Sequence, residues 1–133
     1  MSKKTETANQ LREILGHHPN IRLAILFGSL ATDRAGRDSD LDIAISLGRP
    51  MTSEEQMALI SELGERIGRP VDLIDLTRVG EPLLGQIIRH GRLLVGEKAD
   101  YTKLKVRHLL DQADFVPYQQ RLLAERRQKW IGH

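Results

Sequence analysis

Two aspartates separated by a single residue stand in the first half of this 133-residue sequence. Asp40 and Asp42 flank Leu41 at the start of a largely apolar segment, residues 41–46. Residues two positions apart in a β-strand point to the same face, so we expect both carboxylates about 6–7 Å apart on one face, with Leu41 and Ile43 turned to the core. Carboxylates this close repel each other unless a cation or a shared proton neutralises them. Their oxygen atoms favour Mg²⁺ or Mn²⁺ as that cation.

A possible phosphate cradle precedes this pair. Gly28 and Ser29 interrupt the mostly apolar segment formed by residues 21–27, where the chain has to turn sharply. Glycine lets the backbone approach a ligand closely, and backbone N–H groups with a hydroxyl can hold a phosphate. A magnesium ion held by carboxylates completes its coordination with water and phosphate oxygens. Together the two features predict a site for a nucleoside triphosphate.

A third acid lies in the apolar segment formed by residues 71–76. Asp72 and Asp75 are an odd number of positions apart, so a regular strand turns them to opposite faces and only one can join the pair. Asp72 has the same apolar–Asp–apolar setting as Asp42, and we expect it to bind a metal ion and accept the proton of an attacking hydroxyl. Asp75 is better explained as a strand-end or turn residue.

Helices and strands must alternate along the chain to position these groups. The apolar periodicity predicts helices at residues 5–15, 52–67, 82–90 and from 100 onward, and strands at 21–27, 41–46, 71–76 and 92–95. Thr52 and Glu55 form a capping box for the second helix, whose apolar positions are Met57, Ile60, Leu63 and Ile67. Pro117 predicts a kink or break in the last helix. The fold class is therefore α/β (α+β), a small mixed sheet of three to four strands covered by helices, with residues 1–97 as the core and residues 98–133 as a helical extension of the same domain.

Composition excludes several classes of protein. The sequence contains no cysteine, which excludes disulfide frameworks, zinc ribbons and thiol nucleophiles. No stretch of eighteen apolar residues occurs and no apolar run follows the first lysines, so we expect a cytoplasmic protein without a membrane segment. His90 and His108 have no second ligand at metal-binding spacing and are better explained as helix-surface or satisfied core residues.

The net charge of +2 is unevenly distributed. Residues 1–97 hold 12 Lys and Arg against 14 Asp and Glu, a net charge of −2, and residues 98–133 hold 8 against 4, a net charge of +4. A basic C-terminal segment could meet an acidic protein, a nucleic acid or nucleotide phosphates, or it could be a solvated helix face.

These motifs resemble one known family, the minimal nucleotidyltransferases of the DNA polymerase beta superfamily. Its signature is an apolar residue, Gly-Ser, a spacer of about ten residues, Asp-x-Asp between apolar residues, and a later strand with a third acid. The matching positions are Phe27, Gly28-Ser29, Ser39-Asp40-Leu41-Asp42-Ile43 and Val71-Asp72-Leu73-Ile74. The resemblance covers residues 8–97 and implies the nucleotidyltransferase fold.

The resemblance implies transfer of a nucleoside monophosphate, usually from ATP, onto an acceptor hydroxyl with loss of pyrophosphate. Asp40 and Asp42 would hold two Mg²⁺ ions, or Mn²⁺, and Asp72 would bind one of them. The nucleotide-binding positions that it implies are Gly28, Ser29 and Ser39.

One part of the motif departs from the family. Many members carry Arg-Gly soon after the Gly-Ser start, where this chain has Thr32 and Asp33. Arg37 is a candidate for the missing phosphate contact and is otherwise a surface arginine.

The acceptor implied by the resemblance is another protein. Standalone members of this family are commonly antitoxins of HEPN/MNT toxin–antitoxin systems that transfer AMP to a tyrosine of a HEPN ribonuclease toxin. The resemblance therefore implies a hetero-oligomer or a homo-oligomer and no direct nucleic-acid binding. The alternatives are a small-molecule nucleotidyltransferase of the aminoglycoside-modifying kind and an antitoxin that acts by binding alone. The last helix is either a docking surface or an amphipathic helix closing its own core; the residues concerned are Phe115, Tyr118, Arg121, Arg126, Arg127, Lys129 and Trp130.

Overall fold

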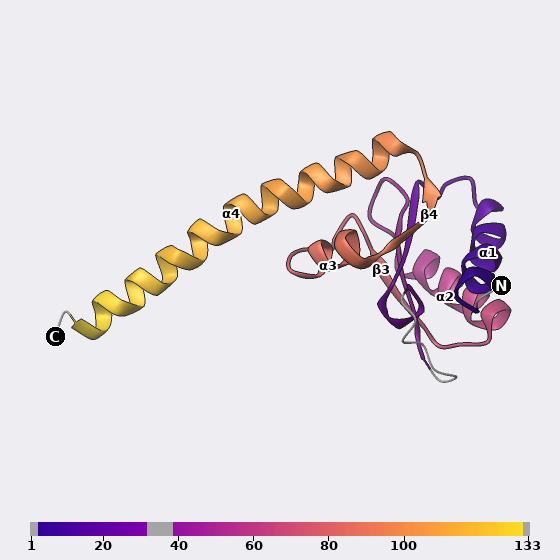
Figure 1. The fold of residues 1–133 in the computed structure, drawn as a ribbon, viewed down its shortest axis with the longest axis horizontal. Coiled ribbons are helices and arrows are strands. Elements are labelled where there is room, and N and C mark those ends of the chain that lie inside the picture. Colours follow the sequence, from indigo (N-terminus) through magenta and orange to yellow (C-terminus); the bar gives the residue numbers. More distant parts are fainter. Residues whose placement is uncertain (1–2, 32–38, 132–133) are drawn as a thin grey trace.

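Helices and strands alternate in the predicted order. The computed structural model describes residues 3–31 and 39–131, with side chains described at residues 6–31 and 39–113 and at Arg121. The elements, drawn in Figure 1, are α1 (Lys3–Gly16), β1 (Leu23–Phe27), the 3-10 helix η1 (Gly28–Ala31), β2 (Leu41–Ser46), α2 (Ser53–Ile67), β3 (Val71–Asp75), α3 (Leu83–His90), β4 (Arg92–Gly96) and α4 (Lys98–Ile131).

The strands form one mixed sheet in the order β3-β2-β1-β4. β1 is antiparallel to β2 and β4, whereas β2 and β3 are parallel. The carboxyl end of β1 and the amino ends of β2 and β3 therefore meet at the same end of the sheet. The pairing places Phe27 opposite Asp42, and Asp42 beside Asp72.

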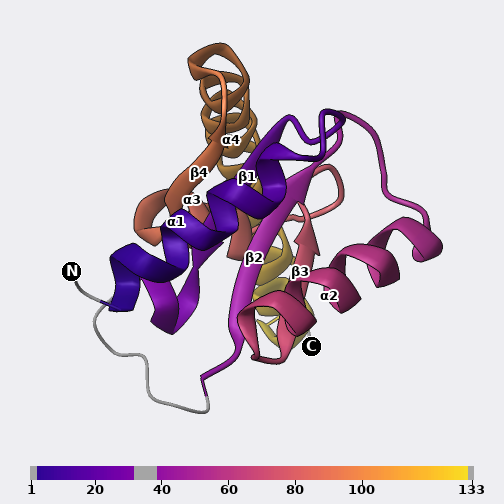
Figure 2. The same ribbon diagram turned by 90° about the vertical axis from the view of Figure 1, so that its right-hand side faces the viewer.

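The sheet separates two hydrophobic clusters. Figures 1 and 2 show α1 and α2 on one face and α3 with the beginning of α4 on the other. Leu41, Ile43 and Ile45 of β2 are fully buried with residues of α1 and α2, as the alternation predicted. The opposite face of β2 contributes Ala44, which packs in the second cluster with residues such as Leu84 of α3. The side chain of Asp42 belongs to this second face by its position in the strand.

The predicted capping box of α2 is confirmed. The Glu55 N–H donates to Thr52 Oγ1 (3.1 Å) and the Thr52 N–H donates to Glu55 Oε1 (3.0 Å). The prediction that Met57 lies on the buried face was wrong, because Met57 is 69% exposed and the buried positions are Leu59 and Leu63. Leu59 and Leu63 are four residues apart and share one side of the helix, and Met57 falls outside that side.

α4 is a single helix of 34 residues. The prediction of a break near Pro117 was wrong, because the helix continues through this residue. Proline removes one backbone donor and costs stability in a helix interior, but it does not end a helix whose other turns are favourable. Figure 1 shows the second half of α4 running away from the sheet. Among the described residues, no helix is apolar enough over a sufficient length to cross a membrane.

Candidate functional site

The turn after β1 packs directly against an aspartate of β2. Gly28 has a φ of +71°, a left-handed conformation that strongly favours glycine. A Cβ atom on Gly28 would overlap Asp42 Oδ2. The chain can therefore turn here only because residue 28 has no side chain, and the half-buried Ser29 follows in η1.

The Asp42 and Asp72 side chains are neighbours across the parallel pair of β2 and β3. Asp42 is half-buried and Asp72 is exposed. Burial raises the pKa of Asp42, and the charges of Asp72 and Asp40 together with a hydrogen bond to the Asp72 carboxyl raise it further. A carboxylate in such surroundings gains stability when a proton or a cation neutralises it. The Asp42 and Asp72 carboxyl groups therefore interact, and the charge of Asp40 also acts on Asp42.

Asp40 immediately precedes β2 and is exposed. Two hydrogen bonds tie this segment to the beginning of β3: Arg69 Nη1 donates to the Ser39 carbonyl (2.9 Å), and the Leu41 N–H donates to the Pro70 carbonyl (2.8 Å). They fix the backbone that carries Asp40 relative to the backbone that carries the third acid. Sequence reasoning missed Arg69, since only the parallel pairing of β2 with β3 reveals what its side chain contacts.

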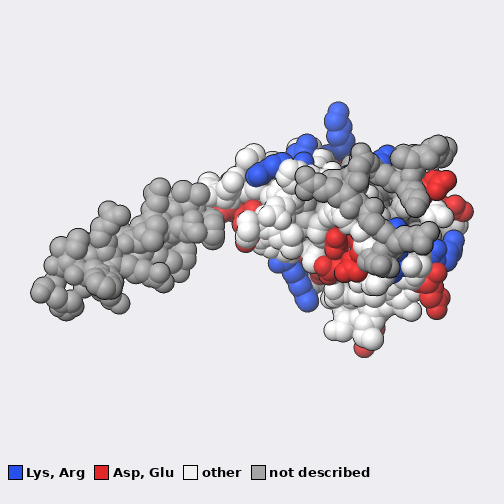
Figure 3. Space-filling model, turned by 60° about the horizontal axis from the view of Figure 1, so that its bottom comes forward, with Lys and Arg blue, Asp and Glu red and all other residues white. Residues whose placement is uncertain are grey.

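The donor set at this end of the sheet consists of carboxylate oxygens, which suit Mg²⁺ and Mn²⁺. Within the described residues, no group of three or more His, Asp or Glu side chains is already arranged to hold a metal ion. The surroundings of Asp42 nevertheless fit a divalent cation. The charges of Asp72 and Asp40 raise the pKa of Asp42, and a bound cation would relieve the same repulsion that a proton relieves. Figure 3, turned to bring the lower end of the molecule forward, shows Asp and Glu side chains gathered on this surface.

Asp75 lies on the other face of the sheet and has a structural environment. It is 9% exposed and accepts hydrogen bonds from the Met51 N–H (2.9 Å), the Thr77 N–H (3.0 Å) and the Thr77 hydroxyl (2.7 Å). Burial by itself would raise the pKa of Asp75, but these hydrogen bonds and the charge of Arg78 hold it below its ordinary value. The interpretation of Asp75 as a strand-end and turn residue agrees with these contacts.

Arg37 lies outside the described residues, and so do Thr32 and Asp33. Ser39 is half-buried at the edge of the described part.

His90 and His108, which the sequence analysis singled out, lie on α3 and α4. His90 is exposed on α3. His108 Nδ1 is hydrogen-bonded to Glu81 Oε1, and the Glu81 and His108 side chains are 9% and 13% exposed. This contact joins the start of α3 to α4, so His108 is a satisfied core residue. Its partner could not be found from spacing, because 27 residues separate the two.

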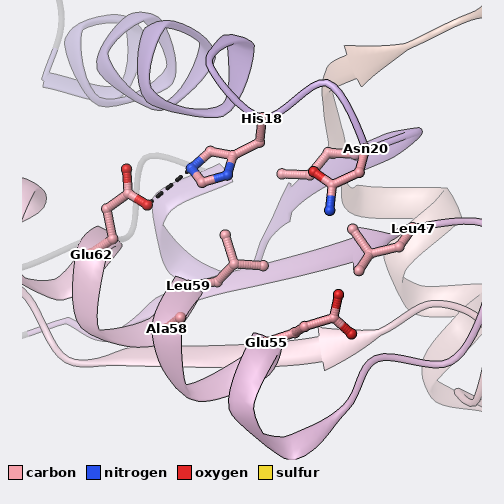
Figure 4. Close-up of a pocket in the computed structure, with 8 residues that line it drawn as sticks. His18, Asn20, Leu47, Glu55, Ala58, Leu59 and Glu62 are labelled. Atoms are coloured by element: carbon pink, nitrogen blue, oxygen red, sulfur yellow. Dashed lines mark hydrogen bonds and ion pairs between the residues drawn. The ribbon is translucent and has the colours of Figure 1, made fainter.

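A small cavity of about 170 Å³ lies between α2 and the segment that joins α1 to β1 (Figure 4). His18 Nε2 and Glu62 Oε2 form a hydrogen-bonded pair (2.9 Å) at its rim, and Leu59 lines it. The cavity is below the about 300–1,000 Å³ typical of ligand sites, and Leu59 belongs to the cluster on the α1 and α2 side of the sheet. It is too small for a nucleoside triphosphate and lies apart from the three acids.

Comparisons with known proteins agree with this geometry. Residues 9–100 match the family model described as polymerase beta nucleotidyltransferase. A protein adenylyltransferase, MntA of Shewanella oneidensis, is 30% identical over 82 residues, which are 62% of this chain and 59% of that protein. The chain thus matches less than two thirds of the length of this relative.

Two solved structures have the same fold over most of their length. One is a toxin–antitoxin crystal structure with AMP-PNP, at 24% identity and a TM-score of 0.78, covering 89% of this chain and 96% of the other. The second is a tri-AMPylated Shewanella oneidensis HEPN toxin in complex with an MNT antitoxin, at 22% identity and a TM-score of 0.74, covering 92% and 97%. At these identities the likeness establishes the nucleotidyltransferase fold. With the match over residues 9–100, the chain belongs to the polymerase beta nucleotidyltransferase family.

Proposed function

We propose that this protein transfers AMP from ATP to a tyrosine hydroxyl of a cognate HEPN-type ribonuclease and acts as its antitoxin. The observation that carries the proposal is the contact between the Gly28 turn, Asp42 and Asp72 at one end of the sheet of a nucleotidyltransferase. The acceptor oxygen forms a bond to the α-phosphorus of ATP, the bond from that phosphorus to the bridging oxygen breaks, and pyrophosphate leaves with the electron pair.

Each acidic residue has a distinct part in this proposal. Asp40, Asp42 and Asp72 would together hold two Mg²⁺ ions, with Mn²⁺ as a substitute, which would neutralise charge on the triphosphate and on the leaving pyrophosphate. Asp72 is more exposed than Asp42. Its carboxylate can therefore reach an acceptor that approaches from solvent and take the hydroxyl proton.

The remaining predicted positions would bind the nucleotide. Gly28 brings the backbone of the turn against Asp42, and the next residue, Ser29, would offer its N–H and hydroxyl to the phosphates. Ser39 adjoins Asp40 in sequence and is fixed by Arg69. Arg37 would contact the phosphates from the segment that joins η1 to β2.

The choice of acceptor is supported by the relatives. The relative at 30% identity is named a protein adenylyltransferase, and one structure with the same fold contains a tri-AMPylated HEPN toxin bound to its antitoxin. We therefore propose a hetero-oligomer with a HEPN-type protein in the cytoplasm, where ATP is abundant, and no nucleic-acid partner.

The test is transfer of label from ATP labelled at the α-phosphate. The protein is incubated with Mg²⁺ and the HEPN-type toxin proposed as its partner, and the modified residue is located by mass spectrometry. We expect one or more AMP groups on tyrosine, loss of transfer with EDTA, and loss of transfer in Asp42→Asn. The matched control is Glu65→Gln, which changes an exposed acid of α2 and should leave transfer intact.

Other outcomes would contradict the proposal in recognisable ways. Label on an aminoglycoside would indicate a small-molecule nucleotidyltransferase. A stable complex with the HEPN-type protein and no label would indicate an antitoxin that acts by binding alone.

A further inference from the structure

We propose that a basic pocket at the end of the sheet opposite the three acids binds a phosphate group, either free or attached to a small organic molecule. We call it the distal pocket and define it by its cationic residues Arg22, Lys103 and Arg107. This inference does not depend on the proposed function, because it concerns other residues and a ligand that binds without any transfer reaction.

The distal pocket is a cavity of about 240 Å³. It lies where β1 begins and where β2 and β3 end, and the beginning of α4 supplies the rest of its wall. Ser46, which lines it, follows Asp42 by four residues in β2, a span of about 13 Å at 3.3 Å per residue. In Figure 1 this end of the sheet lies at the top, where β4 leads into α4. The distal pocket is therefore separate from the three acids.

Positive charge predominates on the walls of the distal pocket. Its three cationic residues are accompanied by one acid among the described lining residues, Asp100. In the part of the chain that the structure describes, no ion pair joins Arg22 or Lys103 to an acid. An anion that enters the pocket therefore gains attraction from both side chains without first displacing a carboxylate.

The Arg22 side chain occupies a space that the turn after β2 leaves open. Gly48 in this turn has a φ of +78°, a left-handed conformation that favours glycine. A Cβ atom on Gly48 would lie 2.8 Å from Arg22 Nε. The Arg22 N–H also donates to the Ser46 carbonyl (2.8 Å), which ties the start of β1 to the end of β2. The absence of a side chain at Gly48 thus allows the guanidinium group to lie where it does.

Arg107 is held on the α4 side of the distal pocket. Its Nη1 donates to the Leu76 carbonyl (2.6 Å) and its Nη2 donates to the Val79 carbonyl (2.8 Å). These acceptors are neutral, so they orient the guanidinium group without cancelling its charge, and the nearest acid in an ion pair with it, Asp111, is 3.9 Å away. Because Arg107 is oriented before a ligand arrives, less conformational entropy is lost on binding.

The size and lining of the distal pocket suit a small phosphorylated ligand. Its volume is below the about 300–1,000 Å³ of typical sites for larger molecules, and guanidinium and ammonium groups form charge-assisted hydrogen bonds with phosphate oxygens. Leu23, Leu76 and Leu104 add a buried apolar lining. A larger hollow of about 570 Å³ has Arg22 and Asp100 in common with the pocket, which leaves room for an organic group attached to the phosphate.

The test measures binding of inorganic phosphate, pyrophosphate and AMP by isothermal titration calorimetry in the presence of EDTA. Without a divalent cation the three acids repel anions, so binding under these conditions reports on another site. We expect a dissociation constant below about 1 mM for at least one of these ligands at about 50 mM NaCl, and weaker binding at about 500 mM NaCl. Tighter binding of AMP indicates an organic phosphate as the ligand, and tighter binding of phosphate or pyrophosphate indicates a free anion.

Matched double variants locate the bound anion. Arg22→Gln/Lys103→Gln should weaken binding at least about tenfold, because two cationic groups are lost. Arg66→Gln/Arg89→Gln removes the same charge from α2 and α3 and should alter the affinity less than twofold. All four side chains are exposed, so the midpoint of thermal unfolding without ligand should be the same in both variants. Added ligand should raise this midpoint in the wild type and in the second variant only.

Two glycine variants test the position of Arg22 without a change in charge. Gly48 and Gly68 both have left-handed backbones, with φ of +78° and +75°, so alanine strains both to a similar extent. A Cβ atom on Gly68 would meet no other atom within 4 Å, whereas one on Gly48 would displace the Arg22 side chain. Gly48→Ala should therefore weaken phosphate binding, and Gly68→Ala should leave it unchanged.

Three results would overturn the distal pocket. These are absence of binding of all three ligands at concentrations up to about 10 mM, equal affinities of the two double variants, and phosphate binding that requires Mg²⁺ and disappears in Asp42→Asn. The last result would place the anion at the three acids. If phosphate binds through Arg22 and Lys103 but the protein transfers no AMP, the proposed function fails and the distal pocket stands.

Discussion

Replacing Asp42 by Asn should stabilise the protein while removing its activity. The carboxylate of Asp42 is half-buried, touches the Gly28 turn and faces the charges of Asp72 and Asp40. Neighbouring strands lie about 4.8 Å apart, and two charges about 4 Å apart repel by about 1 kcal/mol in water and about 4 kcal/mol at an effective dielectric of 20. Because Asp72 is exposed, the lower end applies. We expect Asp42→Asn to gain about 1 kcal/mol at neutral pH, which is about 3–5 °C in the midpoint of unfolding for a domain of this size.

The free energy of unfolding should depend on pH, because the ionised Asp42 carboxylate destabilises the fold. The pKa of Asp42 is raised in the folded protein, so its ionisation destabilises the fold. The penalty is absent below the pKa of the unfolded chain, grows as pH rises toward the folded-state pKa, and is complete above it. The advantage of Asp42→Asn should therefore be present at pH 7 and vanish toward pH 3.5. Thermal unfolding, followed by circular dichroism without divalent ions, measures the stability difference at pH 7 and its decrease toward low pH.

The same variant should lose AMP transfer by a factor of at least about 10²–10³, the usual cost of removing one group that stabilises transition-state charge. Addition of Mg²⁺ and ATP should raise the unfolding midpoint of the wild type more than that of the variant, because ligands that bind the folded state stabilise it. A variant that is less stable than the wild type at pH 7, or whose advantage does not change with pH, would refute the crowding of charge around Asp42.

Three further substitutions probe other parts of the site. Gly28→Ala should cost about 1–2 kcal/mol for the left-handed backbone and abolish transfer, since the added methyl group would displace the neighbouring carboxylate. Arg69→Ala should reduce transfer about tenfold and raise the Mg²⁺ concentration required for half-maximal rate, because the segment before β2 loses its link to the turn before β3. Asp75→Asn should destabilise the fold by about 1–3 kcal/mol at pH 7 by leaving buried donors poorly matched, and leave the rate per folded molecule unchanged. Since the pKa of Asp75 is lowered by folding, this stabilising contribution is present above the unfolded-state pKa and is lost as pH falls through the folded-state pKa.

Matched variants separate local effects from general damage. A methyl group on Gly80 would meet no other atom within 4 Å, and Gly80 has no positive φ, so Gly80→Ala should behave as the wild type. Arg66 is exposed on α2, and Arg66→Ala should leave the Mg²⁺ requirement unchanged. Equal effects of Gly28→Ala and Gly80→Ala, or of Arg69→Ala and Arg66→Ala, would contradict the contacts on which these predictions depend.

Strand alternation predicts which acids share a face of the sheet, and the register that pairs Asp42 with Asp72 agrees with it. The spacing of Asp40, Asp42 and Asp72 within apolar segments determines which side chains leave the hydrophobic core, and the odd separation of Asp75 removes it from the group. These are local rules of a pleated strand, so they hold before the strand order is known. The order β3-β2-β1-β4 then brings the predicted faces together.

Other features depend on contacts between distant segments and could not be predicted from the sequence. Arg69 reaches the Ser39 carbonyl only because β2 and β3 are parallel neighbours. Glu81 meets His108 only because α4 crosses α3. Met57 is exposed because another side of α2 packs against the sheet. The helix α4 continues through Pro117 because the rest of the helix outweighs the cost of one proline. Residue type alone determines neither feature.

The most direct measurement compares two acids of the same strand. Asp72 and Asp75 are three residues apart on β3 and lie on opposite faces of the sheet. AMP transfer to the HEPN-type protein is measured by mass spectrometry for Asp72→Asn and Asp75→Asn at a temperature where both are folded. We predict that Asp72→Asn transfers no AMP and that Asp75→Asn transfers it at the rate of the wild type. Transfer by Asp72→Asn, or its loss in folded Asp75→Asn, would contradict a catalytic centre on the Asp42 face of the sheet.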